Sequence, residues 1–166
     1  VLGGVDLTGR RVLITGAAVG LGRETARAMA AHGADVTILA RSAERAAEGA
    51  AAVSALVPGA TVSTGVVDLG SRASINAFAD GWLADHDAFD VLINNAGVMA
   101  TPHEVTVDGY ELQFATNHLG HAALTAHLLP LLLATDASRV GTVSRLAHRS
   151  GTIAFADLQT QRGNRH

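Results

Sequence analysis

The chain has 166 residues, with 12 basic residues against 15 acidic ones, a net charge of −3 and no cysteine. This length suits one compact domain with its own core, and the absence of cysteine excludes disulfides and thiolate metal sites. The scattered basic residues and slightly negative charge exclude a nucleic-acid-binding surface, so we expect no nucleic-acid partner.

Five short runs rich in β-branched residues alternate with helical patterns along the chain. This alternation is typical of βαβ units on a parallel sheet, in which the strands are buried on both faces. We therefore expect an α/β fold, and we assign residues 1–166 to one domain. The strands are expected at residues 10–16, 35–40, 61–67, 89–94 and 138–144.

Helices are expected between these strands. The first should have Leu21, Thr25, Met29 and His32 on one face and end at Gly33.

Ser42 is expected to cap the second helix, which should stop before Pro58, and Ser71 is expected to cap the third. The inner faces should carry Ala46, Ala50 and Val53 in the second helix and Ile75, Phe78 and Trp82 in the third.

The fourth helix is predicted from Asp108 to Leu133, with a bend near Pro130. Its apolar stretch at residues 122–134 is shorter than the roughly 20 residues needed to cross a bilayer, so we interpret it as a buried helix and expect no membrane span. The polar residues 159–166 are expected to be frayed. The N-terminus lacks the basic-then-apolar order of a signal peptide, and a cytoplasmic location is expected.

The segment TGAAVGLG, from Thr15 to Gly22, joins the first strand to the first helix. In such a turn, backbone N–H groups can approach a phosphate, and the helix N-terminus adds a partial positive charge. Gly16 should permit the sharp exit from the strand, Gly20 the approach of the phosphate, and Gly22 the packing of helix on sheet. A glycine-rich turn alone is also common in structural βα connections, so other residues must decide.

The spacing Thr-Gly-x-x-x-Gly-x-Gly resembles the short-chain dehydrogenase/reductase family. Further features agree in order: Asp68-Leu69 after the third strand, NNAG at residues 94–97, Asn117 in the fourth helix and a serine ending the fifth strand. INNAGVM, TVDGYELQFATNHLGHAALT and the segment from LAH to DLQ look most like the retinol dehydrogenase-like branch. The resemblance covers residues 10–158 and implies a Rossmann-type doubly wound parallel sheet with helices on both faces. The last strands of that fold are missing from the chain as written, so the domain is expected to be incomplete at its C-terminal end.

The resemblance also implies a nicotinamide dinucleotide site at the carboxyl edge of the sheet. Thr15 and the NNAG stretch would tie neighbouring strands, Asp68 would accept from the adenine amine, and Ala96 and Gly97 would leave room for the nicotinamide ribose. Asp68 could alternatively, or additionally, cap a helix. The implied cofactor-binding residues are Thr15, Gly16, Val19, Gly20, Leu21, Gly22, Arg41, Asp68, Leu69, Asn94, Ala96 and Gly97.

The end of the second strand indicates the choice of cofactor. Ala40 stands at the family's acidic position, which would bind the ribose 2′-hydroxyl of NAD(H), and Arg41 follows it. An arginine here accommodates a 2′-phosphate, so NADP(H) is predicted in preference to NAD(H). The alternative is that Arg41 is a solvated loop charge.

The family's chemistry moves hydride between the nicotinamide and a carbonyl carbon, with a Tyr, a Lys four residues later, a Ser and an Asn. The only tyrosine is Tyr110, Phe114 lies four residues on, and all twelve basic residues are arginine. Composition therefore excludes the Tyr-x-x-x-Lys pair. Arg145 occupies the expected serine position, although Ser144 could substitute through a local shift; Asn117 matches, or it satisfies helix backbone.

The resemblance assigns the fourth helix to a dimer interface, which implies a homodimer or tetramer. His118, His121 and His127 are therefore interpreted as surface or interface residues, and no metal site is expected because no third ligand of suitable spacing accompanies them. The implied substrate is a small lipophilic carbonyl or alcohol.

Three accounts of the missing catalytic pair remain open. In the first, the sequence is part of a longer reductase. In the second, the chain is a non-catalytic NADP-binding module or truncated pseudoenzyme that acts through binding or dimerisation, and its fifth strand has an exposed edge. In the third, it is a scaffold without nucleotide, which would leave Arg41 and the glycine spacing without a role. We favour an NADP(H)-dependent oxidoreductase whose 166 residues alone bind cofactor without turnover.

Overall fold

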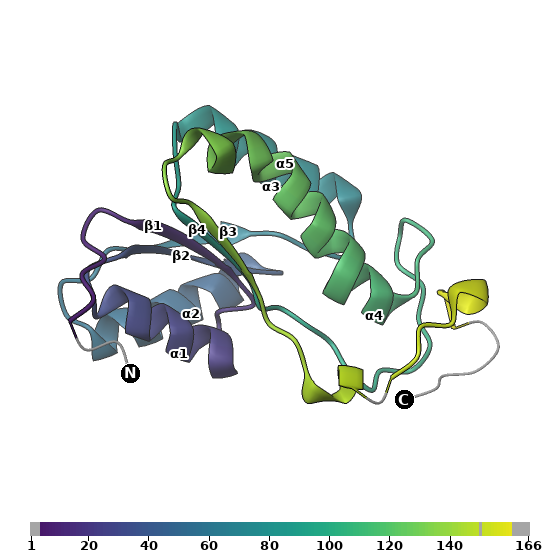
Figure 1. Cartoon of the computed structure of the whole chain (residues 1–166). Helices are drawn as coiled ribbons and strands as arrows, with labels where there is room; N and C mark the ends of the chain where they lie inside the picture. The colour runs from purple at the N-terminus through teal and green to yellow at the C-terminus, as the bar shows by residue number, and fades with distance from the viewer. Residues whose placement is uncertain (1–3, 150, 161–166) are drawn as a thin grey trace.

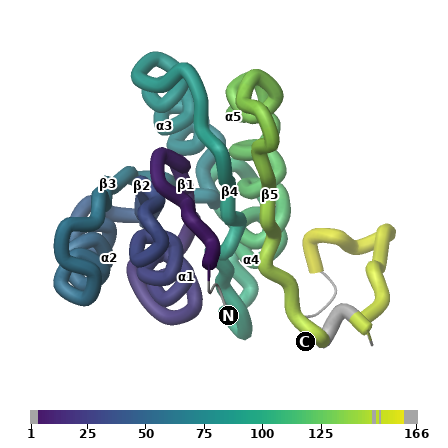
Figure 2. Tube along the Cα trace, turned by 60° about the vertical axis from the view of Figure 1, so that its left-hand side comes forward, coloured from purple at the N-terminus to yellow at the C-terminus, as the bar shows by residue number. Residues whose placement is uncertain are grey.

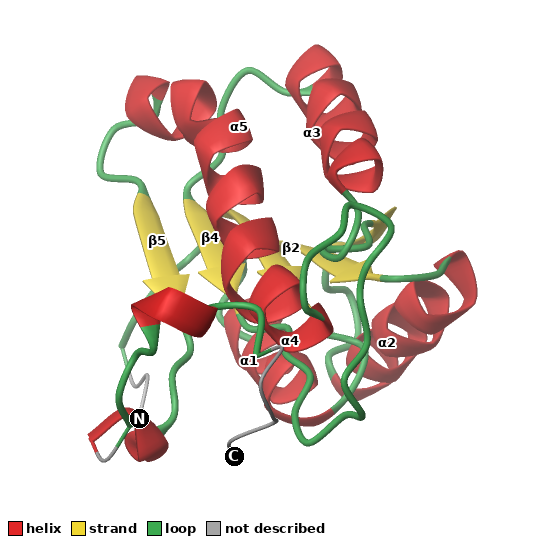
Figure 3. Ribbon diagram, turned by 90° about the vertical axis from the view of Figure 1, so that its right-hand side faces the viewer, coloured by secondary structure: helices red, strands yellow, loops and turns green. Residues whose placement is uncertain are grey.

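A five-stranded parallel sheet in the order β3-β2-β1-β4-β5 forms the centre of the molecule. The computed structural model describes residues 4–149 and 151–160. The arrowheads of β4 and β5 point the same way in Figure 3. Each strand lies within its predicted range: β1 (Arg11–Thr15), β2 (Asp35–Ala40), β3 (Val62–Val66), β4 (Val91–Asn94) and β5 (Arg139–Thr142).

Helices cover both faces of the sheet, as expected for the Rossmann-type fold. In Figures 1 and 2, α1 (Gly20–Ala30) and α2 (Ala43–Leu56) lie on one face, and α3 (Arg72–Asp85) and α5 (Gly120–Ala134) lie on the other. The strand order reverses between β1 and β4, because β1 is followed in the chain by β2 on one side and pairs with β4 on the other. In open α/β sheets, ligands bind at the carboxyl ends of the strands beside such a reversal.

The two helical layers produce two apolar clusters, because successive side chains of a strand point to opposite faces. Towards α3 and α5, Leu13 and Leu92 of the central strands pack with Leu124 and Leu128 of α5. Towards α1 and α2, the cluster contains Val12, Ile14, Val36, Ile38, Ala26, Ala30 and Val53.

The predicted face of α1 packs on the sheet only in part, with Met29 half-buried against the second cluster. Leu21 is 75% exposed, and the buried residues of α1 are Gly22, Ala26 and Ala30. Small residues let the helix backbone approach the sheet closely, and this close approach outweighs the burial of a leucine at the first turn. The positive φ of Gly33, +92°, agrees with its predicted place at the helix end.

The caps of α2 and α3 are confirmed. The Ser42 side chain accepts a hydrogen bond from the backbone of Arg45, and the Ser71 side chain accepts one from Ser74. α2 ends at Leu56, before Pro58. Its buried residues include Ala46 and Val53, and α3 buries Ile75 with Phe78 and Trp82 packed against the same cluster.

The structure divides the predicted fourth helix into three elements. A bridge between Val105 and Glu111 precedes α4 (Leu112–Phe114), a π-helical turn follows as η1 (Ala115–Leu119), and α5 continues through Pro130 to Ala134. The helix starts at Leu112 rather than Asp108 because the Glu111 carboxylate accepts from the backbone N–H groups of Gln113 and Phe114, which makes Glu111 the N-cap.

The strands of the parallel sheet were expected to be buried on both faces, but the edge strands β3 and β5 are not. β1 and β2 are almost fully buried, whereas all four residues of β5 and most of β3 are exposed. Among the described residues, β5 pairs only with β4. Two short 3₁₀ turns follow β5 in the described part of the chain, η2 (Leu146–Arg149) and η3 (Phe155–Asp157).

The expected fraying of residues 159–166 is wrong at Gln159. Its side-chain oxygen accepts from the Glu111 N–H at 2.6 Å. Residues 161–166 lie outside the described part of the chain. No helix in the described part has both the length and the apolar character that crossing a membrane requires.

Candidate functional site

A cavity of about 320 Å³ lies at the carboxyl ends of β1, β2 and β4, where the strand order reverses. All the predicted cofactor-binding residues line it except Gly20, Asp68 and Asn94. The lining residues are Thr15, Gly16, Ala18, Val19, Leu21, Gly22, Leu39, Ala40, Arg41, Arg45, Val67, Leu69, Asn95, Ala96, Gly97, Val98 and Thr116.

The glycine turn forms one wall of this cavity. Gly16 has φ +65°, and a Cβ atom there would lie 2.7 Å from the Ala96 Cα. α1 then begins at Gly20, and its N-cap Val19 makes no side-chain capping bond to the first turn. The first N–H groups of a helix have no partner within the helix, so this end of α1 offers donors and a partial positive charge to an anion in the cavity.

Two arginines stand at the next strand end. Arg41 follows β2 directly, and Arg45 lies in the first turn of α2; both line the cavity and both are exposed. The prediction included Arg41 and missed Arg45. The signal was present in the sequence, because Ser42 caps α2 and so brings the first turn of that helix, with Arg45, next to Arg41.

The opposite wall is the segment at residues 95–98, which we call the NAGV loop. The Thr15 hydroxyl accepts from the backbone N–H groups of Asn95 at 2.9 Å and Ala96 at 3.0 Å. The Asn95 amide donates back to the Thr15 carbonyl at 2.9 Å. The end of β1 is therefore tied to the chain after β4, as the sequence predicted.

Asn117 holds the far end of the NAGV loop. Its Oδ1 accepts from the Val98 N–H and its Nδ2 donates to the Val98 carbonyl, both at 2.8 Å. The side chain therefore binds loop backbone rather than helix backbone. Its position in the π-helical turn η1 fits the frequent occurrence of such turns at functional sites. Its part in a proton relay stays a prediction.

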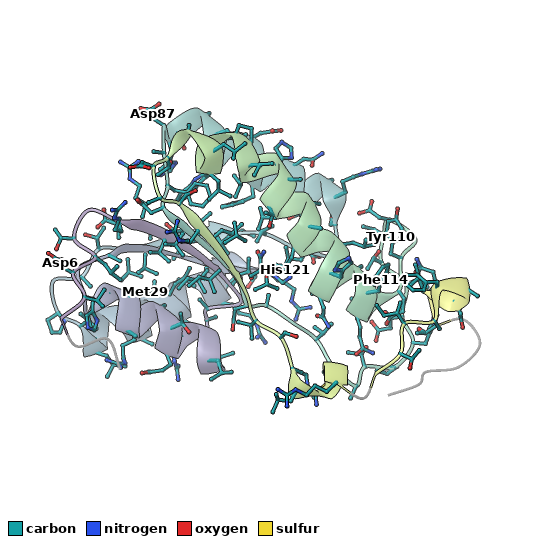
Figure 4. All side chains as sticks on the ribbon, in the orientation of Figure 1. Asp6, Met29, Asp87, Tyr110, Phe114 and His121 are labelled. Atoms are coloured by element: carbon teal, nitrogen blue, oxygen red, sulfur yellow. The ribbon has the colours of Figure 1, made fainter. Side chains whose placement is uncertain are left out.

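His121 was missed as a site residue. It was interpreted as a surface or interface side chain, but it is 5% exposed, with Nε2 2.8 Å from the Thr15 Oγ1 and Nδ1 3.2 Å from the Asn117 carbonyl oxygen. Figure 4 places it where α5 meets the ends of the central strands. Burial lowers the pKa of His121 below its ordinary value, and the hydrogen bond to Asn117 opposes this shift. The missed signal was its spacing from Leu124 and Leu128, which puts all three on the buried face of α5.

Three predicted cofactor residues do not line the cavity: Gly20, which begins α1, Asp68 and Asn94. The Asp68 carboxylate accepts from the Gly70 N–H at 2.9 Å, just before the Ser71 cap of α3. Asn94 is buried, and its amide donates to the Thr125 hydroxyl at 3.1 Å. Asn95, which was predicted within the NNAG stretch but not as a cofactor-binding residue, lines the cavity instead. Cofactor contacts for Asp68 and Asn94 stay predictions.

The residues considered for the chemical step do not line the cavity. Ser144 and Arg145 follow β5 and are exposed, and the Arg145 guanidinium contacts the Met99 sulfur. Tyr110 is 44% exposed and lies on the turn before α4 (Figure 4). The structure thus brings no tyrosine to the cavity, in agreement with the missing Tyr-x-x-x-Lys pair.

The other two histidines of the predicted fourth helix lie in different surroundings. His118 is exposed and stacks on Phe114, and the His127 Nε2 lies 2.9 Å from the Asp80 Oδ1 of α3. Within residues 4–149 and 151–160, no group of three or more metal-ligating side chains could hold a metal ion.

Comparisons with known proteins give one consistent result. Residues 10–156 match the family model described as short chain dehydrogenase. Human retinol dehydrogenase 12 is 42% identical over 158 residues, which cover 95% of this chain and 50% of that protein. The chain therefore spans about half the length of the curated relatives it matches.

Solved structures agree with this result. A crystal structure of a protein from Mycobacterium Paratuberculosis superposes with a TM-score of 0.82 and 43% identity, covering 96% of this chain and 55% of that one. A metagenomic short-chain oxidoreductase in complex with NADP superposes with a TM-score of 0.76 and 30% identity, covering 89% of this chain and 67% of that one.

Proposed function

The chain belongs to the short-chain dehydrogenase/reductase family and fits its retinol dehydrogenase-like branch, and from this premise we propose that its cavity binds NADP(H) rather than NAD(H). The family consists of oxidoreductases. We assign residues 1–166 to one nucleotide-binding domain of such an enzyme, which interconverts an alcohol and a ketone or aldehyde.

The pair of arginines beside Ala40 carries the choice of cofactor. An acidic side chain at this strand end would accept from the ribose 2′-hydroxyl, but Ala40 has none, and Arg41 and Arg45 both line the cavity there. Guanidinium groups bind phosphate oxygens through several donors, so two of them favour a 2′-phosphate over a hydroxyl. The NADP bound to the metagenomic oxidoreductase supports the same choice.

The remaining walls fit the rest of a dinucleotide. The uncapped N-terminus of α1 and the glycine turn suit a pyrophosphate, because backbone donors and the helix dipole both point to an anion there. The NAGV loop presents small side chains at Ala96 and Gly97, which leaves room for a ribose. When bound, the nicotinamide group supplies the hydride chemistry.

The chain's own residues bind and orient, and they do not complete the reaction. Reduction of a carbonyl also requires a proton donor within hydrogen-bond reach, and this sequence has no lysine and one tyrosine, which lies away from the cavity. We therefore propose that these 166 residues bind NADPH without turnover. Activity of a longer protein on a small lipophilic alcohol or carbonyl is part of the same proposal.

A second candidate is a non-catalytic NADP-binding module or truncated pseudoenzyme. Arg145 favours it, because a permanently charged guanidinium cannot act as the neutral hydroxyl donor that orients a carbonyl. Such a module would act through binding or through dimerisation. The exposed apolar residues Leu129 and Leu133 on α5 support association into a homodimer or tetramer. A cytoplasmic location is part of the same proposal, and a chain without cysteine is compatible with a reducing compartment.

Isothermal titration calorimetry with NADPH and NADH tests the choice of cofactor. We expect tighter binding of NADPH, a loss of that preference in the double variant Arg41→Ala/Arg45→Ala, and no change in Arg72→Ala, an exposed arginine outside the cavity wall. Equal affinities for the two cofactors would contradict the proposal. NADPH oxidation above the buffer rate with a panel of small aldehydes would overturn the expected lack of turnover.

A further inference from the structure

We propose that His121 is a positioning residue for the dinucleotide site: a neutral imidazole with its proton on Nδ1 that holds both anchors of the NAGV loop. The inference rests on the proposed function, because this loop forms one wall of the proposed NADP(H) cavity.

The two anchors are far apart in the chain, and the His121 side chain contacts both of them. Thr15 holds the start of the loop through the N–H groups of Asn95 and Ala96, and Asn117 holds its end through both backbone groups of Val98. The Nε2 of His121 contacts the Thr15 hydroxyl, and its Nδ1 contacts the backbone carbonyl oxygen of Asn117, the residue whose side chain holds Val98. A shift of this imidazole would therefore be transmitted to both ends of the loop.

The hydrogen bonds of the Thr15 hydroxyl determine which ring nitrogen carries the proton. A hydroxyl has one proton to donate and two lone pairs to accept with. The N–H groups of Asn95 and Ala96 occupy both lone pairs. The proton has two possible acceptors, the Ile93 carbonyl at 3.4 Å and the His121 Nε2 at 2.8 Å, and the shorter distance lies in the normal range for such a bond. Nε2 is therefore the acceptor and carries no proton.

The second nitrogen follows from the first. A neutral imidazole with an unprotonated Nε2 has its proton on Nδ1, which can donate to the Asn117 carbonyl oxygen at 3.2 Å. The donors then run in one direction: the N–H groups of Asn95 and Ala96 to Thr15, the Thr15 hydroxyl to His121, and His121 to Asn117. A proton on Nε2 would leave the Thr15 hydroxyl facing three donors and would loosen the start of the loop.

The surroundings of His121 are consistent with a neutral ring. Thr15 and Asn117, its two hydrogen-bond partners, are uncharged, and the side chain is buried. An apolar residue of similar size would fill the same space at lower desolvation cost, so a purely packing role would not require an imidazole.

Long-range ¹H–¹⁵N NMR of the ¹⁵N-labelled protein tests the assignment without any ligand. At neutral pH we expect a pyrrole-type nitrogen at Nδ1 and a pyridine-type nitrogen at Nε2, with the His121 signals identified by their loss in His121→Gln. The opposite tautomer or a fast-averaged pair of signals would overturn the proposal.

Three variants separate the two hydrogen bonds. His121→Gln can place an acceptor oxygen near the position of Nε2, His121→Asn can place a donor near the position of Nδ1, and His121→Leu keeps the volume but neither bond. We expect His121→Leu to weaken NADPH binding at least tenfold, and each amide variant to restore part of that loss. The thermal unfolding of each variant is recorded, so that binding is compared only among folded proteins.

The outcomes distinguish this inference from the proposed function. If the wild-type chain binds no NADPH but shows the Nδ1–H tautomer, the proposed function fails while the hydrogen-bond assignment stands. If His121→Leu binds NADPH as tightly as the wild type, the positioning role fails while the proposed function stands.

Discussion

The two ends of the cavity are formed by different kinds of chemical group. At the phosphate end, backbone groups of the glycine turn and two exposed arginines face the cavity, and all of them come from the β1-α1-β2-α2 segment. At the other end, the NAGV loop is held by neutral side chains from β1, η1 and α5. The first end supplies charge near solvent, and the second supplies a hydrogen-bond network close to the core.

Because of this difference, substitutions at one end should change only the affinity for the cofactor, and substitutions at the other end should also change the stability of the fold. Exposed cations contribute little to the stability of the folded chain, so their removal should reduce the affinity for a bound anion and leave the folded chain intact. Removing one member of the network at the NAGV loop leaves other polar groups without partners, which lowers the free energy of unfolding as well. Binding and unfolding measurements on the same variants should therefore distinguish the two ends.

The largest effect is expected at Gly16, where the two ends of the cavity meet. Gly16→Ala forces a side chain into a positive φ and places its Cβ 2.7 Å from the Ala96 Cα. We expect the free energy of unfolding in urea to fall by about 3 kcal/mol. Gly59→Ala is the matched control, because Gly59 has φ +85° and open space around it, and it should lose only about 1 kcal/mol. Equal losses would show that the contact with Ala96 is unimportant.

The next effect is expected at Thr15. Thr15→Val keeps the shape but removes the hydroxyl, which leaves the N–H groups of Asn95 and Ala96 without that acceptor. We expect a loss of about 2 kcal/mol in chemical unfolding together with weaker NADPH binding. Thr25→Val removes a hydroxyl that only donates to the Leu21 carbonyl on α1, and its stability should stay within about 0.5 kcal/mol of the wild type. A stable Thr15→Val variant would contradict the network described for this end.

A smaller effect, confined to affinity, is expected at the arginines. Arg41→Ala and Arg45→Ala should each weaken NADPH binding about tenfold, leave NADH binding unchanged and leave the unfolding midpoint unchanged. Raising the salt concentration should weaken NADPH binding more than NADH binding, because exposed charges are screened. A variant that loses stability as well as affinity would break the distinction between the two ends.

The smallest effect is expected from pH. Because the folded state lowers the pKa of His121, the unfolded chain binds more protons as the pH falls below about 6.5, and the stability contributed by the neutral ring is lost in that range. We expect the free energy of unfolding to decrease less steeply below pH 6.5 in His121→Gln than in the wild type. Urea unfolding of both proteins at a series of pH values measures the two slopes. An unchanged slope in His121→Gln would show that this ring does not titrate with folding.

Local patterns predicted much of the fold. Each strand is a short β-branched run, and the caps at Ser42 and Ser71 depend on hydrogen bonds to residues three positions away, so the sequence around each one contains the necessary information. The start of α4 was predicted at Asp108 because the helical pattern of the sequence extends to residues before Leu112. The structure starts the helix at Leu112, where the Glu111 carboxylate is the N-cap. The buried positions of α1 were not predicted because periodicity favours large apolar residues, whereas close packing on the sheet selected Gly22, Ala26 and Ala30.

The sequence by itself determined the order of the elements, the glycine turn, Arg41 beside Ala40 and the absence of a Tyr-x-x-x-Lys pair, because these are properties of neighbouring residues or of composition. Only the tertiary structure joined Thr15, Asn117 and His121 around the NAGV loop. The physical reason is that hydrogen bonds between distant segments depend on how β1, β4 and α5 pack together, and a one-dimensional pattern does not contain those distances.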